Sequence, residues 1–365
     1  MDADRRPTSS TPIVAGNCVY TGGVDGVVRA LDLDTGATLW EATTAIDANE
    51  VGQRNLYSMS VDVAGGLVHV NVEHTSDDFP RAQAFDADTG ERKWVSAPLE
   101  FDYPAWQLSN PAIFGGMHFQ ATTGPDADPK ARPGYAFWEA ATGGVIHRQT
   151  TIPVADLDKG FAGGGIWATP AVDTETKYLF VGTANPFSKK IEHRYDNAIL
   201  KIDADRSRDT FGTIVDAYKG WHDSLELNRQ PACDELGGKE PVSYHPSGYS
   251  IACVQLDIDF GASPTLWRNA QNELMVTELQ KSGVVHTLFA DTMERAWTTI
   301  VSTLPPETAG NSASTAYDGR YLIVAPNLYQ MMALEPETGR IAWATPGGES
   351  LNYHPPRSPA ASSTS

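Results

Sequence analysis

The chain has 365 residues, and 41% of them are hydrophobic, which is enough to bury a large core. Its 46 acidic and 27 basic residues give a formal net charge of −19, which argues against nucleic acid and anionic membrane surfaces as partners. No apolar stretch reaches 18 residues, so we expect no membrane-spanning segment.

The region after the first ten residues predicts a group of four short strands. Residues 12–15, 18–21, 27–31 and 37–41 are rich in apolar and β-branched residues, and turns containing Gly, Asn and Asp separate them. Four short strands joined by tight turns form one blade of a β-propeller. We therefore expect the first blade to occupy residues 11–43.

An acidic Thr-Gly turn joins the third and fourth of these strands. In such a turn the Asp accepts hydrogen bonds from backbone N–H groups two residues on, and the Gly supplies a positive φ. Clear copies of the turn end at Gly36, Gly90 and Gly339, and a Trp follows each Gly by four residues. We expect these Trp residues and one further Trp to pack between neighbouring blades: Trp40, Trp94, Trp297 and Trp343.

Degenerate copies of the same phrase bring the total to six. They lie at residues 137–143, 201–206 and 288–293, and in the second of them Arg and Ser replace Thr and Gly. A repeat near fifty residues indicates a propeller or a solenoid. The sequence therefore predicts an all-β fold, a β-propeller of six four-stranded blades whose last blade spans residues 311–345.

We expect one propeller domain over residues 11–347. Residues 1–10 are polar and charged, lack the pattern of a signal peptide, and are expected to be disordered. Residues 348–365 form a Pro/Ser-rich tail. A Pro/Gly-rich excursion at residues 220–258 interrupts the strand pattern between two blades.

The three cysteines indicate an oxidising compartment. Cys233 and Cys253 bracket part of the excursion, and a disulfide between them would stabilise the fold by roughly 3 kcal/mol. Two buried free thiols are the alternative. Cys18 is expected to be a small core residue. We therefore expect a secreted protein, or one of the secretory-pathway lumen or the periplasm.

Several segments carry motifs that the repeat does not explain. They are residues 163–173, 179–186, 197–205, 221–223, 257–264 and 280–284. These segments resemble the quinoprotein alcohol dehydrogenase family, and most closely its polyvinyl-alcohol-dehydrogenase-like branch. The resemblance covers residues 11–347 and implies a propeller that binds pyrroloquinoline quinone (PQQ) in its middle.

The resemblance also implies roles for four residues. Trp167 is similar to the indole on which the quinone stacks, and Lys281 to the cation that touches the quinone oxygens. Asn185 and Asp203 are similar to a calcium ligand and the catalytic carboxylate, which fits the preference of a hard cation for oxygen and the use of a carboxylate as a base. Two alternatives stay open, because Asp203 also occupies the turn-acid position and Asn185 precedes Pro186 and could cap a turn.

This chain departs from the family pattern in the third blade. There the family supplies a Glu that completes the calcium site, whereas residues 121–135 contain no Glu. Asp126 or Asp128 could replace it only if the Pro-rich loop folded inward. The adjacent-cysteine pair of many relatives is absent from the sequence, and the family propeller has eight blades. We therefore expect a partly eroded cofactor site.

What remains is the pattern of an aromatic-lined pocket at the propeller axis. Its expected lining comes from the loops that depart most from the repeat: Tyr57, Trp106, Trp167, Asn185, Trp221, His222, Asp223 and Lys281. The neighbours His222 and Asp223 form either an acid/base pair or a structural element.

The first functional hypothesis is a cofactor-independent enzyme that binds a largely apolar small molecule. It would promote a cyclisation or a hetero-Diels–Alder-like cycloaddition in secondary metabolism by positioning its substrate and donating to a developing charge. The catalytic candidates are Lys281, Asp203, His222 and Asp223, with no metal.

Two other classes remain as alternatives. The first is a PQQ- and calcium-dependent alcohol dehydrogenase, with Asn185 and Asp203 as calcium ligands. The second is a protein-binding propeller scaffold. The sequence leaves the oligomeric state open.

Overall fold

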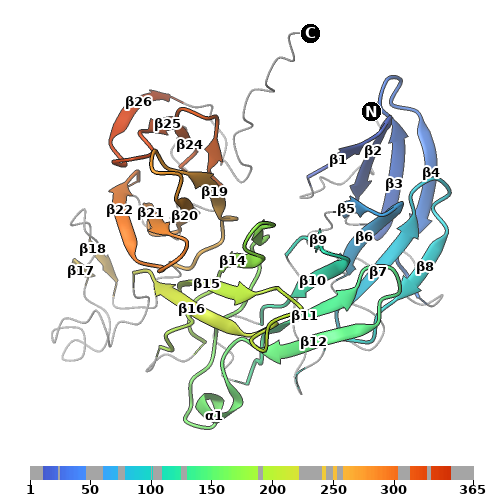
Figure 1. The fold of residues 1–365 in the computed structure, drawn as a ribbon, viewed down its shortest axis with the longest axis horizontal. Helices are drawn as coiled ribbons and strands as arrows, with labels where there is room; N and C mark the ends of the chain where they lie inside the picture. The colour runs from blue at the N-terminus through green and yellow to red at the C-terminus, as the bar shows by residue number, and fades with distance from the viewer. Residues whose placement is uncertain are drawn as a thin grey trace. The chain divides into compact units, whose positions relative to one another are not determined.

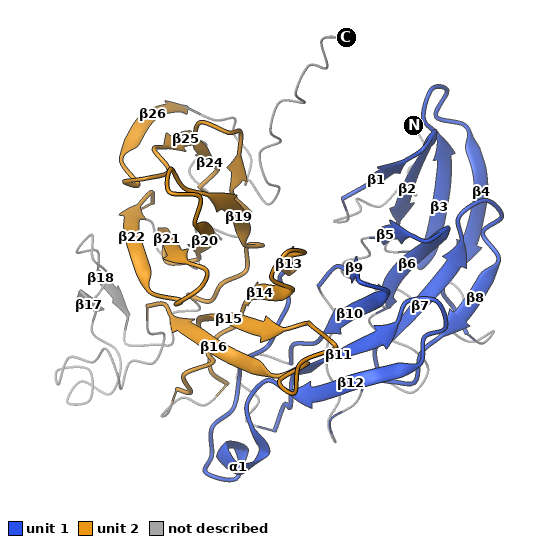
Figure 2. Cartoon of the chain, viewed as in Figure 1, with its two compact units in different colours: residues 1–169 blue, residues 170–365 orange. Residues whose placement is uncertain are grey.

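The computed structural model describes residues 11–23, 25–46, 61–72, 79–99, 101, 109–124, 130–187, 192–221, 241–243, 250–252, 258–302, 313–326 and 330–346. The chain forms two compact units, which are residues 1–169 (unit 1) and residues 170–365 (unit 2), as Figure 2 shows.

In its described residues, unit 1 contains three four-stranded antiparallel sheets, each built from consecutive strands (Figure 1). The first has β1 (Ile13–Ala15), β2 (Cys18–Gly22), β3 (Val27–Asp32) and β4 (Thr38–Thr43). The second has β5 (Val61–Ala64), β6 (Leu67–Val72), β7 (Arg81–Asp86) and β8 (Arg92–Val95). The third has β9 (Ala112–Phe114), β10 (Met117–Ala121), β11 (Gly134–Glu139) and β12 (Val145–Thr150), and the short helix α1 (Val154–Leu157) follows.

Unit 2 contains three more four-stranded sheets and a hairpin within the described ranges. The fourth sheet has β13 (Ala171–Asp173), β14 (Tyr178–Gly182), β15 (Ala198–Asp203) and β16 (Ile214–Lys219). The hairpin is β17 (Pro241–Ser243) and β18 (Ser250–Ala252). The fifth sheet has β19 (Thr265–Arg268), β20 (Leu274–Gln280), β21 (Val284–Phe289) and β22 (Arg295–Ile300), and the sixth has β23 (Ala316–Tyr317), β24 (Leu322–Val324), β25 (Gln330–Leu334) and β26 (Ile341–Pro346).

The same irregularity marks all six of the described four-stranded sheets. In each, the register between the third and fourth strands shifts by one residue just before the turn that joins them. A bulge of this kind leaves one residue unpaired and strengthens the local twist. Because it recurs at one position, it identifies equivalent residues in all six sheets, including those whose turn sequences are degenerate.

The inner strands carry the core. Every residue of β10 and β15 is buried, whereas the outermost strands β4 and β12 expose much of their length. An inner strand that is covered on both faces buries all its side chains, so polar residues such as His118 of β10 are buried together with the apolar ones. The outermost strand can carry exposed as well as buried residues.

Three Trp residues pack against the next sheet, as expected. Their indole Nε1 atoms donate to backbone carbonyls of the following acidic turn: Trp40 to Ala87 at 2.9 Å, Trp94 to Ala140 at 3.0 Å and Trp297 to Pro336 at 2.7 Å. Trp343 lies on the last strand of unit 2 and is 40% exposed.

The structure confirms an all-β protein with six four-stranded antiparallel sheets among its described residues, which is consistent with a β-propeller of six blades. The first blade has its four strands within two residues of the expected positions. Cys18 is a free, half-buried thiol packed against the core of the first two sheets. Cys233 and Cys253 lie outside the described residues, so their disulfide stays a prediction, as do the domain bounds.

Candidate functional site

The nine expected site residues are divided between the units. Trp167 belongs to unit 1, and four residues belong to the described part of unit 2: Asn185, Asp203, Trp221 and Lys281. The other four lie outside the described residues: Tyr57, Trp106, His222 and Asp223.

Asp203 ends β15, and its carboxylate is buried in the turn that leads to β16. Its Oδ1 accepts hydrogen bonds from Arg208 Nη1 at 3.0 Å and from the backbone N of Asp205 at 2.9 Å, and its Oδ2 accepts one from Thr210 Oγ1 at 2.5 Å. The turn carboxylates of the first two sheets are bonded in a similar way. Of the two roles that the sequence left open, these contacts are those of a turn acid.

Lys281 lies directly after β20 and forms a buried ion pair. Its Nζ lies 2.7 Å from Asp259 Oδ1, and the two side chains are 15% and 3% exposed. The backbone N of Lys281 also donates to the carbonyl of Asp259 at 3.0 Å. A buried charge is costly unless it is paired, so the two side chains hold each other in a defined position.

The segment that carries Asn185 lies next to this pair. The backbone N of Phe260 donates to the carbonyl of Thr183 at 3.0 Å, two residues before Asn185, whose side chain is 5% exposed. The structure therefore brings the segments of Asn185, Asp259 and Lys281 together beyond the ends of β14 and β20.

Glu278 adds a second buried carboxyl to this region. Its side chain is fully buried, and neither oxygen has a hydrogen-bond partner among the described residues. Burial, together with the charge of Asp259, raises the pKa of Glu278 well above its usual value of 4.5, so we expect it to carry a proton. Gly182 makes the room, because a Cβ at that position would collide with Glu278 Oε1.

Gln280 connects Trp221 and His286 to the Lys281 turn. Its Oε1 accepts from the backbone N of Trp221 at 3.2 Å and lies 3.1 Å from His286 Nε2, and its Nε2 donates to the Trp221 carbonyl at 3.1 Å. Burial lowers the pKa of His286 to about 3, so the imidazole is neutral. Trp221 itself is 36% exposed, so only its backbone is held by this network.

Trp167 is half-buried in unit 1, two residues after the last Gly of a glycine triplet. The backbone N of Ile166 donates to the carbonyl of Thr122 at 2.9 Å, and a Cβ at Gly165 would collide with Thr123. The triplet therefore lies against the start of residues 121–135, the stretch in which the resemblance expects a calcium-binding Glu and this chain has none.

Asp259 and Glu278 are the site residues that sequence reasoning missed. Asp259 lies in the segment 257–264 that resembles the quinoprotein dehydrogenases, but the resemblance implied the catalytic carboxylate at Asp203. Glu278 offered a separate signal, since it is the one ionisable residue of the otherwise apolar or uncharged strand β20. An ionisable side chain is rarely buried in such a strand unless it has a local function.

The donor chemistry in unit 2 fits a calcium-bound quinone. Asn185 and Asp259 offer the oxygen ligands that calcium prefers, and Lys281 offers a cation for quinone oxygens. In the part of the chain that the structure describes, no three His, Cys, Asp or Glu side chains group so that they could hold a metal ion.

None of the helical residues described here forms a segment long and apolar enough to cross a membrane.

Comparison with known proteins places these features in context. A PQQ-repeat family model described as outer membrane protein assembly factor BamB matches residues 1–112. The polyvinylalcohol dehydrogenase of Sphingopyxis sp. (strain 113P3) is 25% identical over 297 residues, covering 75% of this chain and 41% of that protein. The quinohemoprotein alcohol dehydrogenase ADH-IIG of Pseudomonas putida is 29% identical over 214 residues, covering 51% of this chain and 28% of that protein. The chain thus spans less than half the length of these relatives.

Solved structures show the same fold at low identity. The ADHIIG dehydrogenase from Pseudomonas putida HK5 superposes with a TM-score of 0.55 and 16% identity, covering 97% of this chain and 68% of that one. BamB from Moraxella catarrhalis gives a TM-score of 0.53 and 12% identity, covering 93% and 74%. Since one fold serves both a dehydrogenase and an assembly factor, the fold alone does not select between these functions.

Proposed function

We propose that this chain, which is similar to a PQQ-repeat family model and to polyvinyl alcohol and quinohemoprotein alcohol dehydrogenases, oxidises an alcohol with a bound quinone. Its relatives by sequence are named as dehydrogenases, and the match extends over both units. The chain spans under half the length of those relatives, so the proposal applies to the full-length protein that contains this chain.

The observation that carries the proposal is the buried ion pair of Asp259 and Lys281. A carboxylate that is enclosed and held at 2.7 Å from an ammonium is positioned to accept the proton of a substrate hydroxyl as a general base. Asp203 is not available for this step, since its carboxylate accepts three hydrogen bonds within its own turn. Asp259 therefore takes the role that the sequence analysis gave to Asp203.

Asn185, Asp259 and Lys281 are the residues of this chain that would hold the cofactor. When bound, PQQ supplies the electron-accepting carbonyl, and calcium polarises it. Lys281 orients Asp259 through both its ammonium and its backbone N–H. The neighbouring Glu278, kept neutral by burial, adds no second negative charge beside Asp259.

Two substitutions test the assignment in the full chain loaded with PQQ and calcium. Asp259→Asn should lower dye-linked alcohol oxidation by about a hundredfold or more, because the base is lost. Asp203→Asn is the matched control, which should lower the melting temperature and leave the turnover of the folded protein within about twofold. If Asp259→Asn oxidises alcohols at the wild-type rate, Asp259 is not the base.

A cofactor-independent cyclisation or cycloaddition of an apolar substrate is the second candidate. It draws on the absence of a Glu from residues 121–135, where the resemblance expects a calcium ligand, and on the ability of the Lys281 ammonium to donate to a developing charge. It predicts turnover that survives EDTA, whereas the dehydrogenase proposal predicts that EDTA abolishes turnover and that calcium with PQQ restores it.

We also propose a secreted protein, or one of the periplasm or the secretory-pathway lumen, with a small-molecule partner. The match to an outer membrane assembly factor over residues 1–112 favours an extracytoplasmic location. Alkylation of the intact protein before and after reduction tests for the disulfide that is expected in such a compartment. Cys233 and Cys253 should become reactive only after reduction.

A further inference from the structure

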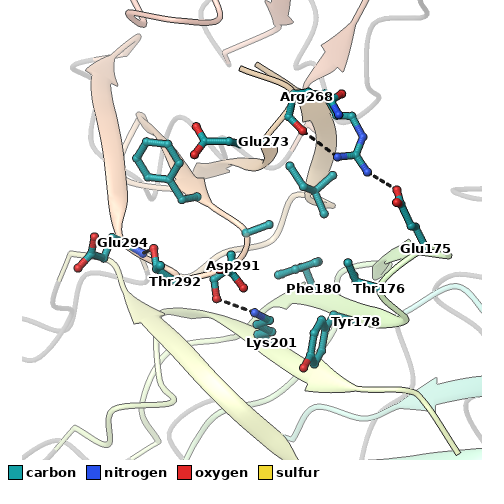
Figure 3. Close-up of a pocket in the computed structure, with 14 residues that line it drawn as sticks. Glu175, Thr176, Tyr178, Phe180, Lys201, Arg268, Glu273, Asp291, Thr292 and Glu294 are labelled. Carbon is teal, nitrogen blue, oxygen red and sulfur yellow. Dashed lines mark hydrogen bonds and ion pairs between the residues drawn. The ribbon is translucent and has the colours of Figure 1, made fainter. Parts of the chain in front are cut away.

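A cavity of about 560 Å³ lies in unit 2 between the fourth and fifth sheets (Figure 3). Its wall is aromatic and aliphatic and includes Tyr178, Phe180, Leu274 and Phe289, which lie on β14, β20 and β21. Its volume falls in the range of ordinary small-molecule sites. It is separate from the Asp259–Lys281 pair, and neither of those residues lines it.

Lys201, which lines the cavity, lies at a position that faces a Trp in four of the six described four-stranded sheets. At the bulge, the residue before the shift faces a fourth-strand partner in each sheet: Ala30 and Trp40, Ala84 and Trp94, Phe137 and His147, Lys201 and Asp216, Thr287 and Trp297, Ala333 and Trp343. Wherever the partner is Trp, the facing residue is small. In the fourth sheet the Trp is replaced by Asp216, and the facing residue is the long side chain of Lys201.

Lys201 takes over the hydrogen bond of the missing indole. Its Nζ donates to the carbonyl of Asp291 at 2.7 Å, in the turn of the fifth sheet, one residue beyond the position whose carbonyl accepts from Trp in other sheets. Figure 3 shows this bond across the cavity. An unbranched amine fills less space than an indole, so the slot stays partly open and Lys201 lines it.

The surroundings of Lys201 lower the pKa of its amine below the usual value of 10.5. The residue is 6% exposed, and among the described residues it makes no ion pair. Its Nζ lies 4.4 Å from the centre of the Tyr178 ring, and Arg208 lies over the same ring at 4.8 Å. Burial is the main cause that lowers the pKa of Lys201; Arg208 acts in the same direction, and the carboxylates of Asp291 and Asp216 oppose it.

We propose that this cavity binds a small neutral aldehyde, which forms an imine with Lys201. The Nζ lone pair attacks the carbonyl carbon, the carbinolamine loses its oxygen as water, and a C=N bond replaces C=O without an oxidant or reductant. The aromatic wall holds the apolar body of the aldehyde. Four carboxylates line the cavity against two cations, Lys201 and Arg268, which disfavours an anionic ligand; these carboxylates are Glu175, Glu273, Asp291 and Glu294.

Reductive trapping tests the proposal on the full chain. The protein is incubated with benzaldehyde and cyanoborohydride near neutral pH, and peptide mass spectrometry follows the labelling of each lysine. Lys177 is the matched control, because it lies on the preceding hairpin, is 53% exposed and is paired with Asp205. Lys201 should be labelled faster than Lys177, because burial lowers the pKa of Lys201 and a lower pKa leaves more neutral amine at a given pH.

Two further measurements exclude a merely reactive surface amine. Toluene, which has the ring but no carbonyl, should slow the labelling of Lys201 and leave that of Lys177 unchanged. Asp216→Trp restores the indole of the other sheets and should protect Lys201 by filling the cavity. Labelling of Lys201 no faster than that of Lys177, or equal in wild type and Asp216→Trp, would overturn the proposal.

Discussion

At the scale of single residues, identical side chains do different work according to what surrounds them. Asp203 and Asp259 are both buried carboxylates of unit 2. Asp203 accepts hydrogen bonds from residues of its own turn, whereas Asp259 is paired with a lysine 22 positions further along the chain. No local sequence pattern indicates such a distant pairing. Sequence reasoning predicted Lys281 and Asn185 because they stand in recognisable motifs. It missed Asp259 because only the folded chain shows which carboxylate faces the lysine.

Glu278 provides a prediction for stability at this scale. Its pKa is raised in the folded state, so the stability linked to its proton is fully present below about pH 4.5 and is lost progressively as the pH rises through the folded-state pKa. Glu278→Gln removes this loss. The variant should therefore gain stability over wild type between about pH 5 and about pH 8, as measured by urea unfolding.

Glu273→Gln is the matched control, because Glu273 is an exposed residue just before the same strand. Its difference from wild type should not change with pH. An equal effect of Glu278→Gln at both pH values would mean that the carboxyl is ionised in the folded protein or is not buried.

At the scale of strands and turns, the repeat was readable because its turn chemistry is local. Acidic residue, Thr and Gly each have a defined role in one turn, so even the degenerate copies predicted a third and a fourth strand. Met293 takes the position of the turn Gly with a φ of 55°, close to the 69° of Gly36. Such a substitution removes the Gly from the sequence pattern without changing the turn. The pattern therefore shows the repeat less clearly than the structure does.

The glycines of these turns yield a matched pair of substitutions. Gly36 and Gly143 have nearly the same φ, 69° and 71°, so Ala costs each about 1 kcal/mol in backbone strain. Nothing lies within 4 Å of a Cβ at Gly36, whereas a Cβ at Gly143 would lie 2.5 Å from the Trp94 ring. Gly143→Ala should therefore cost about 2 to 4 kcal/mol in total, and Gly36→Ala only about 1.

Chemical denaturation of both variants measures the difference directly. The second variant controls for the backbone term, so the excess in Gly143→Ala reports the packing of Trp94 against the next sheet. Equal losses in the two variants would show that the indole moves aside freely, which its bond to Ala140 argues against.

At the scale of the whole molecule, the sequence predicted the fold class and the six sheets more completely than the site. The sheets repeat, so each copy supports the others, and the resemblance to quinoprotein dehydrogenases agrees with the relatives that were found. The site has no such redundancy. Four of its expected residues lie outside the described part of the chain, and its central ion pair joins a residue before β19 to a residue after β20.

The central claim is that the Asp259–Lys281 region belongs to a quinone-binding site. Titration of the purified full chain with PQQ in the presence of calcium, followed by quinone absorbance and metal analysis, tests it without relying on turnover. We expect saturable uptake of about one quinone per chain, with clear loss of affinity in Lys281→Ala and none in Lys177→Ala. Absence of uptake, or equal uptake by both variants, would contradict the claim.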